Sequence, residues 1–241
     1  MGEDAIDWGS YDAVLFDLDG VITPTAEVHM HAWAQMFQRF FDDEGITEPY
    51  TDADYFAYVD GKPRYDGVRS LLAARGIDLP EGEASDPPSA RTVCGLGNRK
   101  NEAFGEVLRE DGVRAYPGSV ALLDVLQNRG MQMAIVSSSA NASAVLEAAR
   151  LLQRFALVVG GDVANEQGLR GKPAPDTFCF AADQLGAAYE RAVVFEDALS
   201  GVQAGRAGRF GLVVGVDRGA GADRLREHGA DIVVADLAEL T

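Results

Sequence analysis

The sequence predicts an α/β protein in which a doubly wound, Rossmann-like parallel sheet carries an inserted all-helical cap domain. Two observations lead to this fold class. From residue 116 onward, short apolar runs alternate with stretches of helical periodicity, which is typical of a mostly parallel sheet. Between a first apolar run at residues 13–16 and that alternating region lies a long stretch without any strand pattern.

The apolar run at residues 13–16 (AVLF) contains no charge, as expected for a buried strand. It ends in the turn sequence DLDG. This strand has no partner near it in the sequence, so it has to belong to the same sheet as the later strands. The stretch that separates them is therefore an insertion after the first strand.

The insertion reads as helices joined by polar segments. Apolar and aromatic residues recur at helical spacing over 26–41, and we expect them to pack inside the insertion. A polar, aromatic-rich stretch (42–60) and a Gly-Lys-Pro turn (61–63) precede a helix through Val68 and Leu71. A surface loop (80–89) precedes another helix at about 98–109. We place the domains at residues 1–24 (core), 25–107 (helical cap) and 108–241 (remainder of the core).

The rest of the chain alternates regularly between helix and strand. We expect strands at 133–136, 156–159, 192–195, 211–215 and 231–234, and helices at 120–128, 142–152, 175–185, 201–207 and before the last strand. Ligands of such sheets bind beyond the carboxyl ends of the strands. The insertion leaves from that edge, so we expect it to cover the site as a lid.

Composition excludes several classes of protein. The chain is 47% hydrophobic and 24% charged, which is typical of a globular protein and not of a disordered or collagen-like one. No apolar run approaches the roughly 20 residues of a membrane helix, and the polar residues 1–8 do not resemble a signal peptide. The net charge of −17 disfavours nucleic-acid binding. With two cysteines, Cys94 and Cys179, we expect no disulfide scaffold and a cytoplasmic location.

Polar side chains gather where the predicted strands end. Because the carboxyl ends of parallel strands meet at one edge of a sheet, we expect them to converge. Three or four carboxylates there suit a hard cation such as Mg²⁺, and of two paired carboxylates one can attack while the other handles a proton. A lysine and serine hydroxyls suit a phosphoryl group. The converging residues are Asp17, Asp19, Ser137, Ser138, Ser139, Lys172, Glu196 and Asp197.

These residues resemble the motifs of the haloacid-dehalogenase-type (HAD) phosphatases and phosphomutases. DLDG at 17–20, Ser137, Lys172 and Glu196-Asp197 match the four motifs of that superfamily in order. Within it, the chain resembles the β-phosphoglucomutase family in FDLDGVIT, YPG (116–118), SSSAN (137–141) and GKPAPD (171–176). In the insertion the match includes Thr25, Ala26, Glu27, His29, Trp33, Gly61, Arg64 and RKN at 99–101.

The resemblance implies a role for each matched residue. Asp17 would be the nucleophile that forms an aspartyl phosphate, and Asp19 the general acid and base. Mg²⁺ would be bound by Asp17, by Asp19 through its carbonyl, and by Glu196 and Asp197. The phosphoryl group would be held by Ser137 and Lys172, and the rest of the substrate by Thr25, His29, Trp33, Gly61, Arg64, Lys100, Ser138, Ser139 and Asn141. Of these, Arg64, Ser139 and Asn141 would hold the second phosphate of a bisphosphate.

The reaction implied by the resemblance is the interconversion of β-D-glucose 1-phosphate and glucose 6-phosphate through β-glucose 1,6-bisphosphate. The partner would be a small phosphorylated sugar, with no nucleic acid and no membrane, and we expect a monomer. The alternative is a HAD-type phosphatase on a small sugar phosphate. The two activities share every core residue and differ in whether a sugar or water accepts the phosphoryl group.

Two positions depart from the family pattern. Pro24 stands where the family usually has Asp, and proline fixes φ and removes a backbone donor. Ala140 stands where the mutases have a lysine, so one cation of the distal phosphate site is missing. Our hypothesis is that Lys62 or Arg99, each beside a matched residue, replaces that charge.

The same residues allow other interpretations. Asp17 and Asp19 could be ordinary turn residues, and His29, Arg64 and Lys100 could be exposed helix residues. A dehalogenase needs no acid on a leaving oxygen, which Asp19 argues against. A phosphorylated receiver domain, which is not an enzyme, would be about half as long and would lack the helical insertion. A pure binding module would not need the second aspartate.

Overall fold

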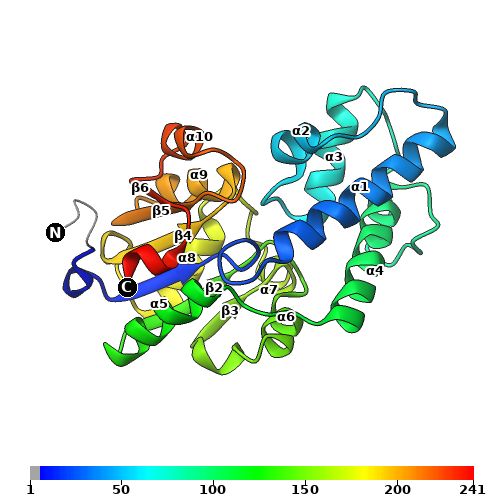
Figure 1. Cartoon of the computed structure of the whole chain (residues 1–241). Coiled ribbons are helices and arrows are strands. Elements are labelled where there is room, and N and C mark those ends of the chain that lie inside the picture. Colours follow the sequence, from blue (N-terminus) through cyan, green and yellow to red (C-terminus); the bar gives the residue numbers. More distant parts are fainter. Residues whose placement is uncertain (1–5) are drawn as a thin grey trace. The chain divides into compact units, whose positions relative to one another are not determined.

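A computed structural model describes residues 6–241 (Figure 1). Residues 1–5, which belong to the stretch that we expect not to be a signal peptide, lie outside the described residues. The chain divides into two compact units. The sheet unit comprises Met1–Pro24 and Val113–Thr241, and the inserted unit comprises Thr25–Gly112. Within the described residues, no helix combines the length and the apolar character needed to cross a membrane.

The sheet unit is built on six parallel strands in the order β3-β2-β1-β4-β5-β6. Their bounds are β1 (Ala13–Phe16), β2 (Gln132–Val136), β3 (Leu157–Val159), β4 (Ala192–Glu196), β5 (Leu212–Val216) and β6 (Ile232–Val234). The central strand β1 is fully buried, and its Leu15 lies level with Ala134 on one side and Val194 on the other. The strand order reverses beside β1, which is where doubly wound sheets bind ligands.

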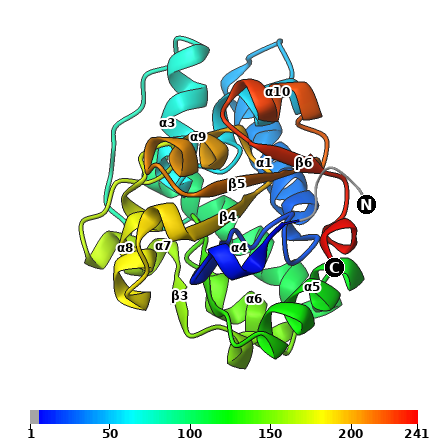
Figure 2. The same ribbon diagram turned by 90° about the vertical axis from the view of Figure 1, so that its left-hand side faces the viewer.

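Helices cover both faces of this sheet (Figure 2). The sheet unit contains α5 (Pro117–Asn128), α6 (Ala142–Ala148), α7 (Gly161–Glu166), α8 (Asp176–Leu185), α9 (Leu199–Ala207) and α10 (Ala222–Glu227). Ala13 and Leu15 pack in one core with Phe178 of α8, Val202 of α9 and Leu225 of α10. Helix α5 and the short η5 (Leu237–Leu240) contact each other on the opposite face. The fold is thus the predicted doubly wound α/β arrangement.

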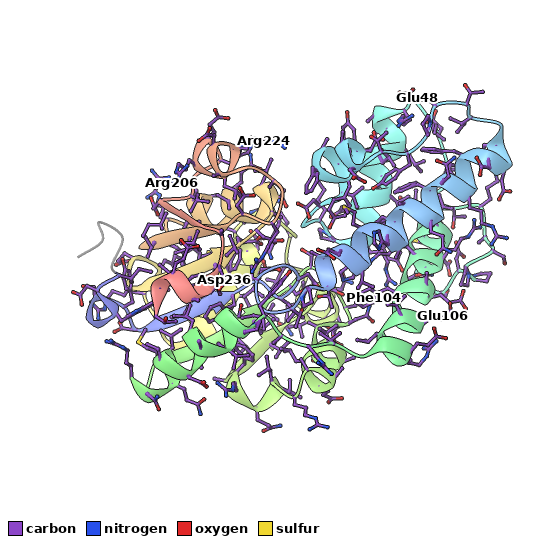
Figure 3. The ribbon with its side chains drawn as sticks, viewed as in Figure 1. Glu48, Phe104, Glu106, Arg206, Arg224 and Asp236 are labelled. Atoms are coloured by element: carbon purple, nitrogen blue, oxygen red, sulfur yellow. The ribbon has the colours of Figure 1, made fainter. Side chains whose placement is uncertain are left out.

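Within its described residues, the inserted unit contains helices and no strand. It contains α1 (Thr25–Glu44), α2 (Asp52–Asp54), a π-helical turn η2 (Tyr55–Val59), α3 (Arg64–Ala74) and α4 (Val93–Asp111). Its core is aromatic, because Trp33 stacks on Phe37, Phe37 contacts Phe41 at a tilt, and these rings of α1 pack in one cluster with Leu71 of α3 and Leu96 of α4. The side chains of both units are drawn in Figure 3, which labels Phe104 on α4.

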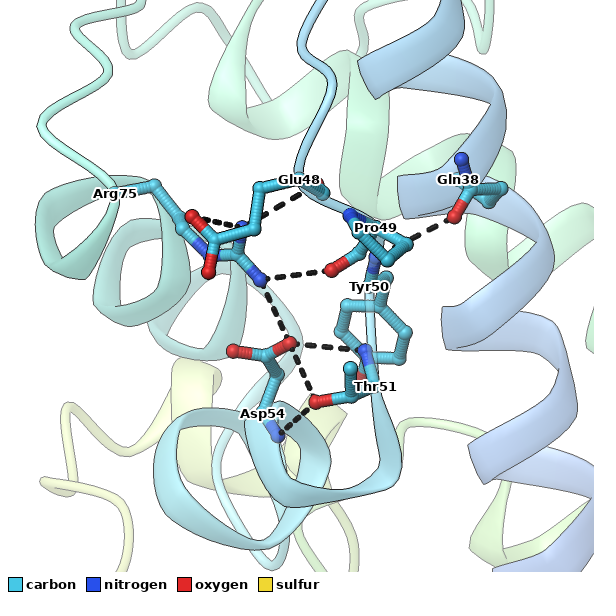
Figure 4. Close-up of polar contacts among 7 residues, drawn as sticks. All are labelled: Gln38, Glu48, Pro49, Tyr50, Thr51, Asp54 and Arg75. Carbon is cyan, nitrogen blue, oxygen red and sulfur yellow. Dashed lines mark hydrogen bonds and ion pairs between the residues drawn. The ribbon is translucent and has the colours of Figure 1, made fainter.

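A polar cluster fixes the segment that follows α1 in the inserted unit (Figure 4). Arg75 donates to the carbonyl of Pro49 at 3.0 Å and to Asp54 Oδ2 at 2.8 Å. Asp54 also accepts from the backbone N–H and the hydroxyl of Thr51, both at 2.9 Å, and so closes a capping box on α2. The Arg75 and Asp54 side chains are each only 12% exposed. This ion pair therefore holds the 45–51 segment against the end of α3.

The structure differs from the sequence prediction at several elements. Residues 52–59 form α2 and η2 where we expect no regular structure, and α7 was not predicted. Helix α4 begins at Val93, earlier than expected, because Thr92 caps it by accepting from the Gly95 N–H at 2.9 Å. It also continues to Asp111, so the inserted unit ends at Gly112 and the expected boundary at residue 107 falls inside this helix.

Candidate active site

Lys172 connects the ends of three strands in the sheet unit. Its ammonium group lies 2.5 Å from Asp17 Oδ1, 2.6 Å from Glu196 Oε1 and 2.9 Å from the carbonyl oxygen of Val136. Asp17 follows β1, Glu196 ends β4 and Val136 ends β2. All three charged side chains are buried. The convergence expected from the parallel sheet thus brings Asp17, Lys172 and Glu196 into one cluster.

The turn after β1 places the second aspartate. The Gly20 N–H donates to the carbonyl of Thr23 at 2.7 Å, and the Ile22 N–H donates to that of Leu18 at 2.9 Å. This folding requires a φ of +86° at Gly20, a conformation that glycine adopts without steric cost. The side chain of Asp197 packs against the Gly20 Cα, where a Cβ would overlap it. Asp19 therefore sits in a tightly closed turn beside Asp197.

Ser137 at the end of β2 reaches the same turn. Its hydroxyl donates to Asp19 Oδ2 at 3.2 Å and accepts from the Ser139 N–H at 3.1 Å. The Ser139 hydroxyl in turn accepts from the Asn141 N–H at 3.2 Å. Backbone N–H groups and hydroxyls thus cluster between β2 and α6, as expected for a loop that binds a phosphoryl group. Ser138 lies in this loop, half-buried.

The acidic pair after β4 is held by the start of α9. Glu196 Oε2 accepts from the Ala198 N–H at 3.0 Å, and its carboxylate packs against the Cα of Gly201, where an added Cβ would overlap it. Glu196 is fully buried and Asp197 is 9% exposed. The two carboxylates therefore take different directions. One faces Lys172 and the other faces the turn at Gly20.

The charges in this cluster do not balance. Two carboxylates, those of Asp17 and Glu196, contact the Lys172 ammonium group, and the carboxyl groups of Asp19 and Asp197 lie at the adjoining turn. Burial raises the pKa of Asp17 well above its usual range; Lys172 opposes this shift, and the carboxylates of Glu196 and Asp19 add to it. Burial would lower the pKa of Lys172, but Asp17 and Glu196 outweigh burial and raise it, so the lysine stays protonated.

This surplus of negative charge bears on whether a divalent cation fits the site. Within the described part of the chain, no three Asp, Glu, His or Cys side chains already surround one point as metal ligands do. The Asp17 and Glu196 carboxylates face Lys172 instead. The available donors are nevertheless carboxylate oxygens, which Mg²⁺ prefers, and a divalent cation would offset the excess charge. The chemistry of the cluster therefore fits Mg²⁺.

A second group of candidate residues gathers inside the inserted unit. The Lys100 ammonium group is hydrogen-bonded to His29 Nδ1 and lies 5.1 Å from the ring centres of both Trp33 and Phe104. The His29 ring stacks on Phe104 at 3.9 Å with an interplanar angle of 2°. His29 and Lys100 are buried, so they are not the exposed helix charges that a plainer interpretation assumes.

The remaining candidates of the inserted unit are Thr25, Gly61 and Arg64. Thr25 is buried at the start of α1, and Gly61 lies between η2 and α3. Arg64 begins α3, and its guanidinium stacks over the ring of Tyr65, 4.9 Å from the ring centre. The hydroxyl of Tyr65 donates to Asn98 Oδ1 at 2.9 Å. Asn98 thereby anchors the Tyr65 ring under the guanidinium.

The two cations suggested as replacements for the missing lysine at Ala140 have partners within the inserted unit. Lys62 Nζ donates to the Ser70 hydroxyl at 2.8 Å, and burial lowers its pKa. Arg99 Nε donates to the carbonyl of Pro88 at 2.8 Å. Pro24, the other departure, directly precedes α1. The replacement of the charge at Ala140 stays a hypothesis.

Sequence reasoning missed residues that support the turn after Asp19. Arg218, in the loop after β5, donates from Nε to the carbonyl of Gly20 at 2.9 Å. Ser119, on α5, donates to that of Val21 at 2.6 Å. Neither residue lies at a strand end that carries a motif, and no periodicity marks them. The YPG segment before Ser119 was the one available signal.

Comparisons with known proteins identify the family of the chain. The family model described as hydrolase, haloacid dehalogenase-like hydrolase, matches residues 11–209. The chain is 49% identical to a beta-phosphoglucomutase of Mycobacterium bovis, with 95% of this chain and 90% of that protein covered. It is 32% identical to the beta-phosphoglucomutase of Bacillus subtilis, with 95% and 91% covered.

A solved structure shows the same fold. The crystal structure of a beta-phosphoglucomutase from Clostridium difficile superposes with a TM-score of 0.77 at 22% identity, covering 96% of this chain and 93% of that one. Family model, sequence relatives and fold agree with one another. The chain is an enzyme of the haloacid dehalogenase-like hydrolase family and belongs, within it, to the β-phosphoglucomutase-like group.

Proposed function

We propose that the protein is a Mg²⁺-dependent phosphohexomutase that interconverts β-D-glucose 1-phosphate and glucose 6-phosphate. The observation that carries the proposal is the buried cluster in which Lys172 joins Asp17 to Glu196 while Ser137 holds Asp19. It provides a nucleophile, a separate carboxyl group for proton transfer and a cation for the phosphoryl group. The similarity to beta-phosphoglucomutases directs the choice of substrate.

In the first half of the reaction, Asp17 carries a phosphoryl group as an aspartyl phosphate. The 6-hydroxyl of β-glucose 1-phosphate attacks that phosphorus, its proton passes to the Asp19 carboxylate, and the bond from phosphorus to Asp17 breaks. The product is β-glucose 1,6-bisphosphate. The Lys172 ammonium and the Ser137 hydroxyl stabilise the charge on the transferring group.

In the second half, the bisphosphate presents its other phosphate to Asp17. The Asp17 carboxylate attacks the 1-phosphate, the bond from phosphorus to the sugar oxygen breaks, and the Asp19 carboxyl gives its proton to that oxygen. Glucose 6-phosphate leaves and the enzyme is phosphorylated again. Asp17 and Asp197 as carboxylate ligands, Asp19 through its carbonyl, and Glu196 would hold Mg²⁺, which offsets phosphate charge when bound.

We assign the inserted unit, residues 25–112, to substrate recognition. Arg64, with Ser139 and Asn141 of the sheet unit, would bind the second phosphate, and His29 and Lys100 would contact the sugar. The other proposed contacts of the substrate are Thr25, Trp33, Gly61 and Ser138. A monomeric state and a cytoplasmic location stay predictions of the sequence.

The alternative is a phosphatase on a small sugar phosphate, with water in place of the sugar hydroxyl. Ala140 favours it, because the loop after Ser137 lacks a cation at that position to hold a second phosphate. The two activities differ in their products. A mutase converts its substrate without net release of phosphate, whereas a phosphatase releases one phosphate for each substrate.

The test is to incubate the purified protein with Mg²⁺, β-glucose 1-phosphate and a trace of β-glucose 1,6-bisphosphate. Glucose 6-phosphate and free phosphate are measured together. We expect glucose 6-phosphate to form well ahead of phosphate, and the activity to vanish with EDTA and in Asp17→Asn. Phosphate release without isomerisation would support the phosphatase. If neither glucose 6-phosphate nor phosphate forms, the choice of sugar is overturned.

A further inference from the structure

The turn that follows Asp19 is held from outside by three separate donors. The carbonyl of Gly20 accepts from Arg218 Nε at 2.9 Å, that of Val21 from the Ser119 hydroxyl at 2.6 Å, and that of Ile22 from the Tyr116 N–H at 3.0 Å. All of these residues belong to the sheet unit. Three consecutive peptide groups are thus fixed, and the one nearest to Asp19 is fixed by an arginine.

Arg218 is itself rigidly held. Its Nη1 donates to the carbonyl of Ala235, after β6, at 3.0 Å. The face of its guanidinium stacks on the ring of Tyr116, with the guanidinium carbon 3.9 Å from the ring centre. Two carbonyls and an aromatic face therefore define both the position and the plane of this group. Arginine's planar fork suits such an arrangement, and the point charge of lysine does not.

The turn is closed from within through the Gly20 and Ile22 N–H groups, whereas the Gly20 carbonyl is held from outside, by Arg218. Gly20 has a φ of +86°, and a glycine peptide can rotate with little steric penalty. Rotation of the Gly20 carbonyl would displace the backbone that carries the Asp19 side chain. Ser137 contacts the carboxyl of that side chain at 3.2 Å, and Arg218 contacts the carbonyl of the residue that follows Asp19 at 2.9 Å.

We propose that Arg218 is a positioning residue that acts through Gly20 to hold Asp19 at the angle needed for proton transfer. This inference rests on the proposed role of Asp19 as the acid and base. It predicts a specific kinetic defect. Loss of Arg218 should slow phosphoryl transfer strongly where the leaving oxygen has to be protonated. It should slow transfer less where the leaving oxygen needs no proton.

The experiment compares phosphorylation of Asp17 by two donors in single-turnover measurements. Acetyl phosphate releases acetate, a good leaving group that needs no proton. Glucose 1,6-bisphosphate releases a sugar oxygen that must be protonated by Asp19. The variants are Arg218→Met, Arg218→Lys and, as a control, Arg224→Met. Arg224 lies on α10 (Figure 3) and its guanidinium contacts the carbonyl of Ala220 of its own unit, away from the turn.

We expect Arg218→Met to slow transfer from glucose 1,6-bisphosphate by about 100-fold, within the range that general acid catalysis contributes. Transfer from acetyl phosphate should change by less than about 3-fold, since it omits that contribution. Arg218→Lys should behave like Arg218→Met, because lysine cannot reach both carbonyls and stack on the ring. The control should match the wild-type protein with both donors.

Equal losses with both donors would overturn the inference, because they would show that Arg218 supports the fold of the whole site. Full activity of Arg218→Lys would also overturn it. Should Arg218→Met not fold, Tyr116→Leu removes the stacking face and should cause a smaller loss of the same selectivity; an unselective loss counts against the inference. A wild-type protein that neither donor phosphorylates would overturn the proposed function, and this inference with it.

Discussion

Replacing Gly201 by alanine should destabilise the protein, although the same change in a helix usually stabilises it. Gly201 lies in α9, and alanine is favoured over glycine in helices by about 1 kcal/mol. Here an added Cβ would overlap the carboxylate of Glu196, which is fully buried. The carboxylate would have to move, and would leave the Ala198 N–H at 3.0 Å and the Lys172 ammonium at 2.6 Å.

The magnitude follows from these losses. Overpacking a buried site costs about 1–3 kcal/mol, and a hydrogen bond to a buried charged group contributes about 1.5–3 kcal/mol. After subtraction of the helix preference, we expect Gly201→Ala to lower the free energy of unfolding of the sheet unit by about 2–5 kcal/mol. Binding of Mg²⁺ should weaken as well, because Glu196 is one of its proposed ligands.

The matched control lies on the same helix. A Cβ at Gly205 would meet Val213 Cγ2 at 3.1 Å and Val194 Cγ1 at 3.3 Å, a close but apolar contact. Gly205→Ala should therefore leave the free energy of unfolding within about 1 kcal/mol of the parent, because helix preference and crowding oppose each other. The two substitutions add the same methyl group and differ in what it touches.

The assay uses the two tryptophans of the chain, Trp8 in the sheet unit and Trp33 in the inserted unit. In a Trp33→Phe background, the fluorescence of the buried Trp8 reports unfolding of the sheet unit in urea. A midpoint for Gly201→Ala at or above that of its parent would refute the reasoning. So would equal shifts for Gly201→Ala and Gly205→Ala.

Three further changes test other parts of the structure. Arg75→Met should lower the stability of the inserted unit by about 3 kcal/mol, read from Trp33 fluorescence in urea, because it leaves Asp54 without its buried partner; an unchanged midpoint would contradict the role of this pair. Arg150→Gly should raise the thermal midpoint through a gain of about 1 kcal/mol, since Arg150 has a φ of +58°. Asp176→Asn should destabilise at pH 7 but not at low pH. Hydrogen bonds from Arg170 lower the pKa of Asp176, so this stabilisation is present above the usual carboxyl pKa and disappears as pH falls through the lowered value; a difference from wild type that persists in acid would contradict it.

The strands of the fold could be predicted because each is a short apolar run between polar turns. Helix α7 and the start of α4 could not. Helix α7 (GDVANE) is too short to show a period, and α4 begins with VCGLG, where two glycines disfavour a helix. Tertiary packing overrides that preference at Gly97, since a Cβ there would lie 2.8 Å from the ring of Tyr65. Glycine is thus required by a neighbour that the local sequence does not reveal.

The candidate site, too, could be predicted only in part from the sequence. The meeting of Asp17 with Glu196 follows from parallel strands, whose carboxyl ends share one edge. That Lys172 bonds to both, or that Arg218 reaches Gly20, depends on loop conformations that have no periodic signature. The order of the motifs identified Lys172 from the sequence, whereas the contact of Arg218 with Gly20 was found in the structure.

The position of the insertion has a consequence for how the chain is made. Strand β1 pairs Ala13 with Gln132 of β2 and with Ala192 of β4, so both of its neighbours are translated long after it. Until then its four apolar residues have no sheet to join. The inserted unit, whose chain is continuous from Thr25 to Gly112, is complete before β2 leaves the ribosome. Synthesis therefore passes through a stage with an unpaired hydrophobic strand, at which chaperone binding to residues 13–16 would protect the nascent enzyme from aggregation.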